Sequence, residues 1–318
     1  MGQHGIGMTD THPHLEDADP QALIEGLVRL LSPQQTGADC FSGMAQPGGV
    51  GRVFGGQVIA QGLRAAGATV GQDQVAHSLH AYFLRGGEEG KPITYRIDRD
   101  FDGRSFCNRR VVAVQDDEPI LNMSVGFQRP EGGVTHQEPT MPEVAGPDGL
   151  QSDAERFRQV LAKRGDAISP QQRAWMERPR PIEIRNVAGS HWRSREPRPP
   201  YAQSWFRAIA SPGDDMAMHR AIIAYASDFM LLGTSALPHG LSWTRGELVS
   251  ASLDHAIWFH REARADEWLL YSTDSPWSGG GRGFNRGQIF NRSGELVASV
   301  AQEGVIRRRK ARESIAGG

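Results

Sequence analysis

The chain has 318 residues, of which 38% are hydrophobic, and its 35 Lys and Arg residues nearly balance its 37 Asp and Glu residues. This apolar content is enough for one large globular domain or two ordinary ones. The net charge of −2 argues against a dedicated nucleic-acid-binding protein, because such proteins gain affinity by neutralising phosphates with clustered basic residues.

The N-terminal segment, residues 1–18, is polar and has neither a basic start nor a continuous apolar run, so no secretory signal is expected. The longest apolar stretch, residues 221–232, is shorter than the roughly 20 residues that cross a bilayer. Cys40 and Cys107 are too few and too far apart for a disulfide framework or a redox motif. We therefore expect a cytoplasmic protein that does not insert into membranes.

Residues 19–130 are predicted to contain helices followed by antiparallel strands. Apolar residues recur at helical spacing over residues 19–32, and again over residues 54–67 after a Gly-rich loop. Four strand-like runs follow, the last three of them joined by short hairpin signals: residues 76–84, 93–101, 104–115 and 119–128. The outline is one long helix followed by an antiparallel meander.

Residues 131–180 are richer in Pro, Gly and charge, which predicts a linker with one short helix near residues 152–163. The order of helix and strands predicted for residues 19–130 then recurs in residues 181–310, which are followed by a C-terminal tail at residues 311–318. A strand at 203–209 precedes a helix at 219–232, and four more strands are predicted: residues 247–259, 267–274, 283–291 and 295–307.

The two halves align with each other at a nearly constant offset. Residues 77–84 align with 251–258 at an offset of 174, and residues 121–125 align with 296–300 at an offset of 175. A duplicated unit explains this better than chance. The chain is therefore predicted to be an α+β protein of two tandem hotdog domains, each a long helix wrapped by an antiparallel sheet, with sites between the units.

The common catalytic and cofactor signatures are absent from the sequence. There is no GxSxG elbow for a serine nucleophile, no GxGxxG or GxxxxGK[ST] loop for a nucleotide, and no HExxH pair for zinc. We therefore expect neither a bound cofactor nor a metal.

Asp228 is the only carboxylate in residues 222–232, the least polar helical segment of the chain. A buried carboxylate has a raised pKa and is a better proton acceptor near neutral pH, which is how enzymes tune general bases. The alternative is a helix-starting cap, in which Ser227 or Asp228 marks a break within the segment.

Gln302 shares one face of the last predicted strand with Leu296, Ala298 and Val300. A buried amide needs hydrogen-bond partners and can orient a water molecule. Exposure at the strand end is the alternative. Ser252 begins another predicted strand, and its hydroxyl could hold a water near Asp228.

His255 follows Asp254 directly in a predicted strand. Neighbouring residues of a strand point to opposite faces, so these two side chains cannot form an acid–base pair with each other. His255 is interpreted as a core histidine whose hydrogen bonds are satisfied.

Seven segments together resemble the acyl-CoA thioesterase II family, over about residues 20–308. They are Val53-Phe-Gly-Gly-Gln57, His77-Ser-Leu-His-Ala-Tyr-Phe-Leu-Arg85, Tyr225-Ala-Ser-Asp228, Leu253-Asp-His-Ala-Ile-Trp-Phe-His260, Glu267-Trp-Leu-Leu-Tyr271, Arg282-Gly-Phe-Asn-Arg-Gly287 and Gln302-Glu-Gly304. The resemblance implies a double hotdog that hydrolyses acyl-CoA to free fatty acid and CoA. It also suggests a homodimer or a homotetramer.

The family's water-activating trio consists of an Asp, a Thr or Ser, and a Gln. By motif, the resemblance places these roles on Asp228, Ser252 and Gln302. Ser252 stands where bacterial relatives often have Thr, which keeps the hydroxyl and loses a methyl group that stiffens the side chain. The implied mechanism is direct attack of a water, without a covalent intermediate or a metal.

The resemblance also bears on the number of sites and on CoA binding. Arg52 precedes the Phe-Gly-Gly turn, where single-domain relatives carry an acidic residue, so one site per chain is expected. Arg282 and Arg286 are candidate CoA contacts because Arg suits phosphate, with an exposed charged hairpin as the alternative.

Two other functions compete with hydrolysis. A hotdog enoyl-CoA hydratase would carry a His five residues after its Asp, but Gly233 stands five residues after Asp228. A non-catalytic acyl-CoA-binding protein is the third possibility, and retention of Asp228, Ser252 and Gln302 argues against it.

Overall fold

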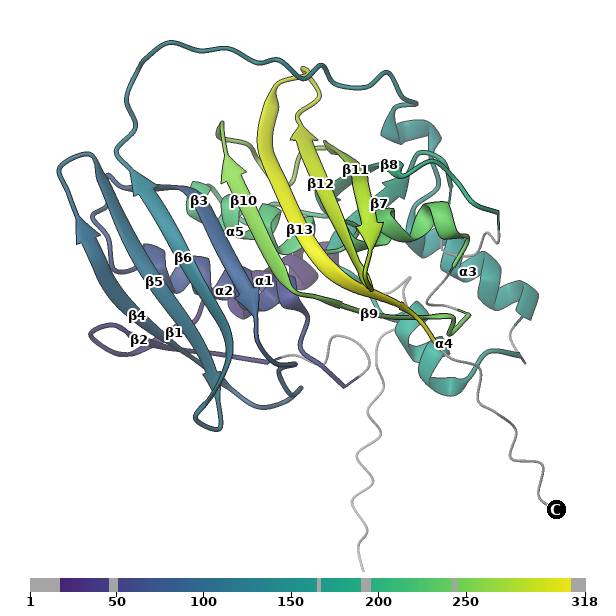
Figure 1. Ribbon diagram of the computed structural model, residues 1–318, viewed down its shortest axis with the longest axis horizontal. Coiled ribbons are helices and arrows are strands. Elements are labelled where there is room, and N and C mark those ends of the chain that lie inside the picture. The colour runs from purple at the N-terminus through teal and green to yellow at the C-terminus, as the bar shows by residue number, and fades with distance from the viewer. Residues whose placement is uncertain (1–17, 46–50, 165–166, 190–195, 242–244, 310–318) are drawn as a thin grey trace, which may run out of the picture.

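A computed structural model describes residues 18–45, 51–164, 167–189, 196–241 and 245–309. In this part of the chain, 13 strands form one sheet in which every pairing is antiparallel. The order along the sheet is β1-β2-β4-β5-β6-β3-β10-β13-β12-β11-β8-β7, with β9 paired to β13. Helices α1, α2 and α5 lie against one face, and α3 and α4 lie at the end of the sheet near β7 (Figure 1).

The elements have the following bounds. The strands are β1 (Gln34–Gly37), β2 (Cys40–Gly43), β3 (Val75–Phe83), β4 (Ile93–Asp102), β5 (Phe106–Gln115), β6 (Glu118–Gln128), β7 (Ile182–Asn186), β8 (Tyr201–Ala208), β9 (Leu248–Ser252), β10 (Asp254–Phe259), β11 (Leu269–Gly279), β12 (Arg282–Phe290) and β13 (Leu296–Arg308). The helices are α1 (Pro20–Leu30), α2 (Gly55–Gly67), α3 (Asp153–Arg164), α4 (Pro170–Glu177) and α5 (Met216–Ser227), with short 3₁₀ turns η1 (Pro147–Gly149) and η4 (Leu232–His239).

The two halves of the sheet have equivalent strand orders when each is counted outward from the middle. On one side β3 is followed by β6, β5 and β4, and on the other β10 is followed by β13, β12 and β11. The two units meet where β3 pairs with β10, with Leu79 opposite Ile257. The first unit wraps its sheet around α2, and the strands of the second unit pack against η4, which follows α5 in the same helical segment, Met216–His239. The predicted double hotdog is confirmed.

The predicted strand over residues 247–259 is in fact two strands, separated at Leu253. β9 pairs with the end of β13, and β10 continues between β13 and β3. Leu253 joins both neighbours, because its N–H donates to Glu303 O and its carbonyl accepts from Phe83 N–H. The break therefore lies at the junction between the two units.

Helix α5 begins and ends earlier than the predicted helix over residues 219–232. Asp215 caps its start by accepting a hydrogen bond from Ala217 N–H, and the helix ends at Ser227 with Asp228 as the C-cap. Residues 216–239 together are long and apolar enough to cross a membrane, but 72% of the apolar window is buried inside the structure. A helix that is apolar all round and buried in this way is typical of a core helix.

The start of α2 approaches α5 closely because Gly55 and Gly56 lack side chains. A Cβ atom on Gly56 would lie 2.5 Å from Tyr225 O and 2.6 Å from an atom of the Phe54 ring. No Cβ contact this short is tolerated without backbone movement, so only glycine allows this packing.

We expect Gly56→Ala to lower the free energy of unfolding by about 1–3 kcal/mol, because the two helices must separate. Gly67→Ala, in the last turn of the same helix, is the matched control. Its Cβ would find its nearest neighbour at 4.0 Å, so it should leave stability unchanged or raise it by up to about 1 kcal/mol. Urea denaturation measures both, and equal losses in the two variants would contradict the packing argument.

Candidate active site

Asp228 lies where the C-terminal end of α5 meets the N-terminal end of α2. Its side chain is 6% exposed, and Oδ2 accepts a hydrogen bond of 2.8 Å from Gly56 N–H. Phe54, the N-cap residue of α2, makes no side-chain capping bond, so Asp228 caps that helix from the other half of the chain. The helix dipole of α2 favours a negative charge at this place.

Gln302 joins Asp228 to Ser252. Its side chain is fully buried on β13, which excludes exposure at the strand end. Nε2 donates to Asp228 Oδ1 at 2.7 Å and to Ser252 Oγ at 2.9 Å. The fold therefore brings together the three side chains that were predicted from separate motifs, one each from the end of α5, from β9 and from β13.

Two opposing influences act on the ionisation of Asp228. Burial raises the pKa of Asp228, the hydrogen bonds from Gln302 and Gly56 stabilise the charged form and lower it, and the resulting pKa is about 6. The net result is a carboxylate that is mostly ionised at neutral pH and can still accept a proton readily.

The trio also has hydrogen-bonding capacity to spare. Both N–H groups of Gln302 are used, while its buried Oε1 has no hydrogen-bond partner in the described part of the chain. The Ser252 hydroxyl accepts from Gln302, so its own proton is available to donate. A small polar molecule beside these groups would find both a donor and acceptors.

His255 only partly fits its interpretation as a satisfied core histidine. It is fully buried on β10, and its Nε2 lies 2.9 Å from Ser227 Oγ. Its Nδ1, however, lies 3.9 Å from Asp228 Oδ1 and has no hydrogen-bond partner among the described residues. The prediction of a fully satisfied side chain is therefore wrong.

Comparison with known proteins decides the family. A model of the acyl-CoA thioesterase N-terminal domain matches residues 44–128, and a model of the acyl-CoA thioesterase C-terminal domain matches residues 149–306. The chain belongs to the acyl-CoA thioesterase II family. It is 38% identical to acyl-coenzyme A thioesterase 8 of Homo sapiens over 261 residues, covering 80% of this chain and 81% of that protein.

Bacterial relatives extend the match. The chain is 33% identical to acyl-CoA thioesterase 2 of Haemophilus influenzae over 285 residues, which cover 90% of this chain and 98% of that protein. The crystal structure of acyl-CoA thioesterase II TesB2 from Mycobacterium marinum matches with a TM-score of 0.71 and 36% identity, covering 91% of this chain and 99% of that one. The protein is thus a thioester hydrolase.

Within this acyl-CoA thioesterase, the first half lacks a matching trio. At the offset of 175 that aligns residues 121–125 with residues 296–300, the counterpart of Asp228 is Val53, an apolar residue. At the offset of 175, the counterpart of Gln302 is Phe127, a buried apolar residue. In the described part of the chain, the carboxylate and the amide therefore occur together only in the second half.

Three aromatic side chains lie where α2 approaches α5, and none of them was predicted to be a site residue. The Phe54 ring stacks on Phe229 at 4.6 Å between centroids and meets Tyr225 edge-on at 5.2 Å. The i, i+4 spacing of Tyr225 and Phe229 in the segment that carries Asp228 was the available signal. These rings give the candidate site an apolar wall.

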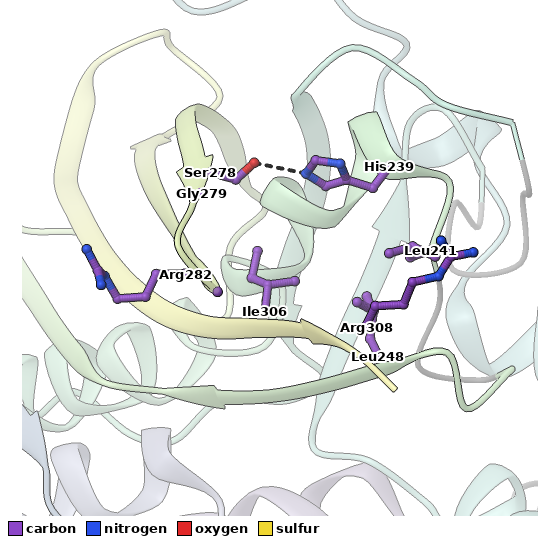
Figure 2. Close-up of a pocket in the computed structure, with 9 residues that line it drawn as sticks. His239, Leu241, Leu248, Ser278, Gly279, Arg282, Ile306 and Arg308 are labelled. Atoms are coloured by element: carbon purple, nitrogen blue, oxygen red, sulfur yellow. Dashed lines mark hydrogen bonds between the residues drawn. The ribbon is translucent and has the colours of Figure 1, made fainter. Parts of the chain in front are cut away.

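The two candidate CoA contacts lie on the β11–β12 hairpin of the thioesterase. Arg286 pairs with Asp274 at 2.9 Å, and Arg282 pairs with Glu303 at 2.9 Å. Arg282 also lines a cavity of about 190 Å³ at the ends of η4 and β13 (Figure 2). Contact of either arginine with CoA stays a prediction.

That cavity lies on the face of β13 that carries Gln302. Ile306, four residues further along the strand, forms part of its lining together with Arg308. His239 stands at the other side, where its Nε2 lies 2.9 Å from Ser278 Oγ (Figure 2). The cavity therefore combines an apolar floor with basic side chains.

Proposed function

We propose that this thioesterase hydrolyses acyl-CoA by direct attack of a water held by Asp228, Ser252 and Gln302. The observation that carries the proposal is the double hydrogen bond of Gln302 Nε2, which fixes the carboxylate and the hydroxyl next to each other. A water beside them can accept the free proton of Ser252 and donate to Asp228. Its oxygen then keeps a lone pair for attack.

In the proposed reaction, the water oxygen forms a bond to the thioester carbonyl carbon while Asp228 takes one proton from the water. The carbon–sulfur bond then breaks, CoA leaves as a thiolate, and the proton on Asp228 returns to the sulfur. The products are a fatty acid and CoA, and no group of the protein is consumed. This is general-base catalysis without a covalent intermediate.

The hydratase and binding-protein alternatives predict different chemistry. A hydratase would leave the thioester intact, and a binding protein would release no thiol. Assembly into a homodimer or homotetramer and a cytoplasmic location stay predictions from the sequence.

Thiol release and oxygen labelling test the proposal. The wild-type protein is expected to release free CoA thiol from at least one member of a panel of acyl-CoAs of increasing chain length. In a single turnover in H₂¹⁸O with enzyme in excess, one labelled oxygen should appear in the fatty acid and none in the peptide that contains Asp228. Label in Asp228 would show attack by the carboxylate itself and overturn direct water attack.

The pH dependence of kcat/KM should report the ionisation of Asp228. Because burial raises the pKa of Asp228 to about 6, the base is ionised above that pH and is lost by protonation below it. We expect kcat/KM to fall about tenfold per pH unit below pH 6 and to level off between pH 7 and 8. A rate that stays constant from pH 7 to pH 5 would exclude Asp228 as the base.

A further inference from the structure

The hydrogen bonds around His255 determine which of its nitrogens carries the proton. Ser227 Oγ donates to Ala224 O at 2.8 Å, so its remaining capacity toward His255 Nε2, at 2.9 Å, is that of an acceptor. Nε2 must therefore be the protonated nitrogen. Nδ1 is left as a bare acceptor with a lone pair.

The same nitrogen faces the proposed base. His255 Nδ1 lies 3.9 Å from Asp228 Oδ1, too far for a direct hydrogen bond but within reach of a small shift of either side chain. His255 is 0% exposed, and burial lowers the pKa of His255 to about 3, so the ring is neutral at the pH of the reaction. The two side chains therefore do not form an ion pair.

Among the residues that the structure describes, two titratable side chains from different strands stand beside Asp228. His255 comes from β10, and Tyr271 from β11 donates its hydroxyl to Ser227 O at 2.9 Å. Burial raises the pKa of Tyr271 well above its usual range, so it stays neutral as well. The other partners of Asp228 are Gln302 from β13 and Gly56 N–H from α2, which donate to the carboxylate and do not titrate.

An unprotonated ring nitrogen has opposite effects on the ionised and the protonated forms of the carboxyl group. Facing an ionised Asp228, the lone pair of Nδ1 is mildly repulsive and offers no hydrogen bond. Facing a protonated Asp228, it can accept the new O–H. The acceptor is thus useful only after Asp228 has taken a proton.

We propose that His255 is a positioning residue that acts through Asp228: its Nδ1 accepts a hydrogen bond from the carboxyl group after that group has taken the proton of the attacking water. The inference rests on the proposed function, because it concerns the state of Asp228 that hydrolysis creates. No proton is transferred to His255. The proton stays on Asp228 until the thiolate takes it.

Two substitutions separate the nitrogens of His255. His255→Gln keeps a donor near the position of Nε2, toward Ser227, and removes the acceptor near Asp228. His255→Asn places its Oδ1 near the position of Nδ1 and removes the donor to Ser227. A purely structural role would make both variants less stable without moving the pH profile.

The pH profile of kcat/KM is the deciding measurement, with the acyl-CoA that the wild type cleaves fastest. In His255→Gln we expect the acidic limb to move to lower pH by about one unit and kcat at pH 7 to fall about tenfold, because the protonated form of Asp228 has lost its partner. In His255→Asn the limb should stay at the wild-type position. If the acidic limb of the kcat/KM profile lies at the wild-type pH in both variants, the inference is overturned.

Failure of the proposed role of His255 can be distinguished from failure of the proposed function. Absence of thiol release by the wild type, or full activity of Asp228→Asn, would remove the proposed function itself, whereas unmoved limbs in an active enzyme remove only the role of His255. If His255→Gln does not fold, ¹⁵N NMR of the wild type gives the second measurement. A proton on Nε2 and a bare Nδ1 are expected, and a proton on Nδ1 would overturn the inference.

Discussion

Asp228→Asn is expected to lower kcat for thioester hydrolysis by a factor of about 10³, within the range that general bases contribute. Asparagine has the shape of aspartate and its Oδ1 can still accept from Gly56 N–H, which holds the carboxylate in the wild type at 2.8 Å. It cannot accept a proton from water, so it removes the proton acceptor and keeps the shape of the side chain. Initial rates of thiol release measure the loss.

The matched control is the same substitution at an exposed carboxylate. Asp214, 95% exposed and paired only with the partly exposed Arg264 in the described structure, can be changed to Asn without affecting the site. Asp214→Asn should keep the wild-type rate. Because the role proposed for Asp228 is exerted on bound substrate, KM in Asp228→Asn should change by no more than a few fold. A variant that loses affinity while keeping kcat would assign Asp228 to binding.

Two residues of the candidate site could be predicted because each is a polar side chain in an otherwise apolar segment. Asp228 was visible as the single carboxylate of an apolar helical segment, and Gln302 as an amide on the apolar face of a long strand. Both side chains are buried in the structure. Their contact could not be predicted from either pattern, because it depends on how β13 lies against the end of α5.

Tertiary contacts explain the main errors in the predicted elements. Leu253 lies within a run of strand-forming residues, yet the strand breaks there. Before Leu253 the strand pairs with the end of β13, and after it the next strand also pairs with β3. The apolar pattern continues past Ser227 because η4 is also buried, so periodicity could not locate the end of α5. A break does occur at this place, but Asp228 is the C-cap that ends α5 and not a helix-starting cap, because the N-cap of η4 is Leu231.

Other elements were missed for local reasons. β1 is fully exposed and carries no apolar alternation, so the pattern gave no signal for it. Helix α4 did carry one: Ser169 is followed by a Pro at the first helical position, which is a typical helix start. The linker therefore holds α3 and α4 rather than the one helix predicted.

The state of His255 lay outside what a sequence can specify. Strand alternation gives the face on which a side chain lies but not the partners of its two ring nitrogens. Ser227, 28 residues earlier in the chain, contacts Nε2, and Asp228 Oδ1 lies 3.9 Å from Nδ1. His255, which the sequence suggests is a core histidine, thus lies beside the proposed base.

Asp228→Asn should also make the protein more stable, which is the opposite of what the loss of a hydrogen-bonded side chain would suggest. An unfolded Asp titrates near 3.9, and burial raises the pKa of Asp228 in the folded protein to about 6. Above pH 6 the carboxylate is ionised in both states, and folding must bury its charge at a cost of about 3 kcal/mol. Asn carries no charge and avoids this cost.

The hydrogen bonds of the site can adjust to the new amide. Asn at position 228 would present an N–H₂ group to Gln302 Nε2, which now donates to Oδ1 at 2.7 Å. Rotation of the Gln302 amide would bring its unpartnered Oε1 to that position, where it can accept from the new amide and from the Ser252 hydroxyl. The substitution therefore leaves no buried donor facing another donor.

The gain should depend on pH with a definite sign. As the pH falls from 6 toward 3.9, the folded protein takes up the proton before the unfolded chain does, so the cost of burying the wild-type carboxylate disappears. We expect Asp228→Asn to raise the free energy of unfolding by up to about 3 kcal/mol at pH 8 and by about 1 kcal/mol or less at pH 4.5, measured by urea denaturation. Asp214→Asn should change it by less than about 0.5 kcal/mol at either pH. A variant at position 228 that is less stable than the wild type at pH 8, or whose gain is the same at both pH values, would mean that the carboxylate is not held in the folded protein at an energetic cost, and the physical basis for its action as a base near neutral pH would be lost.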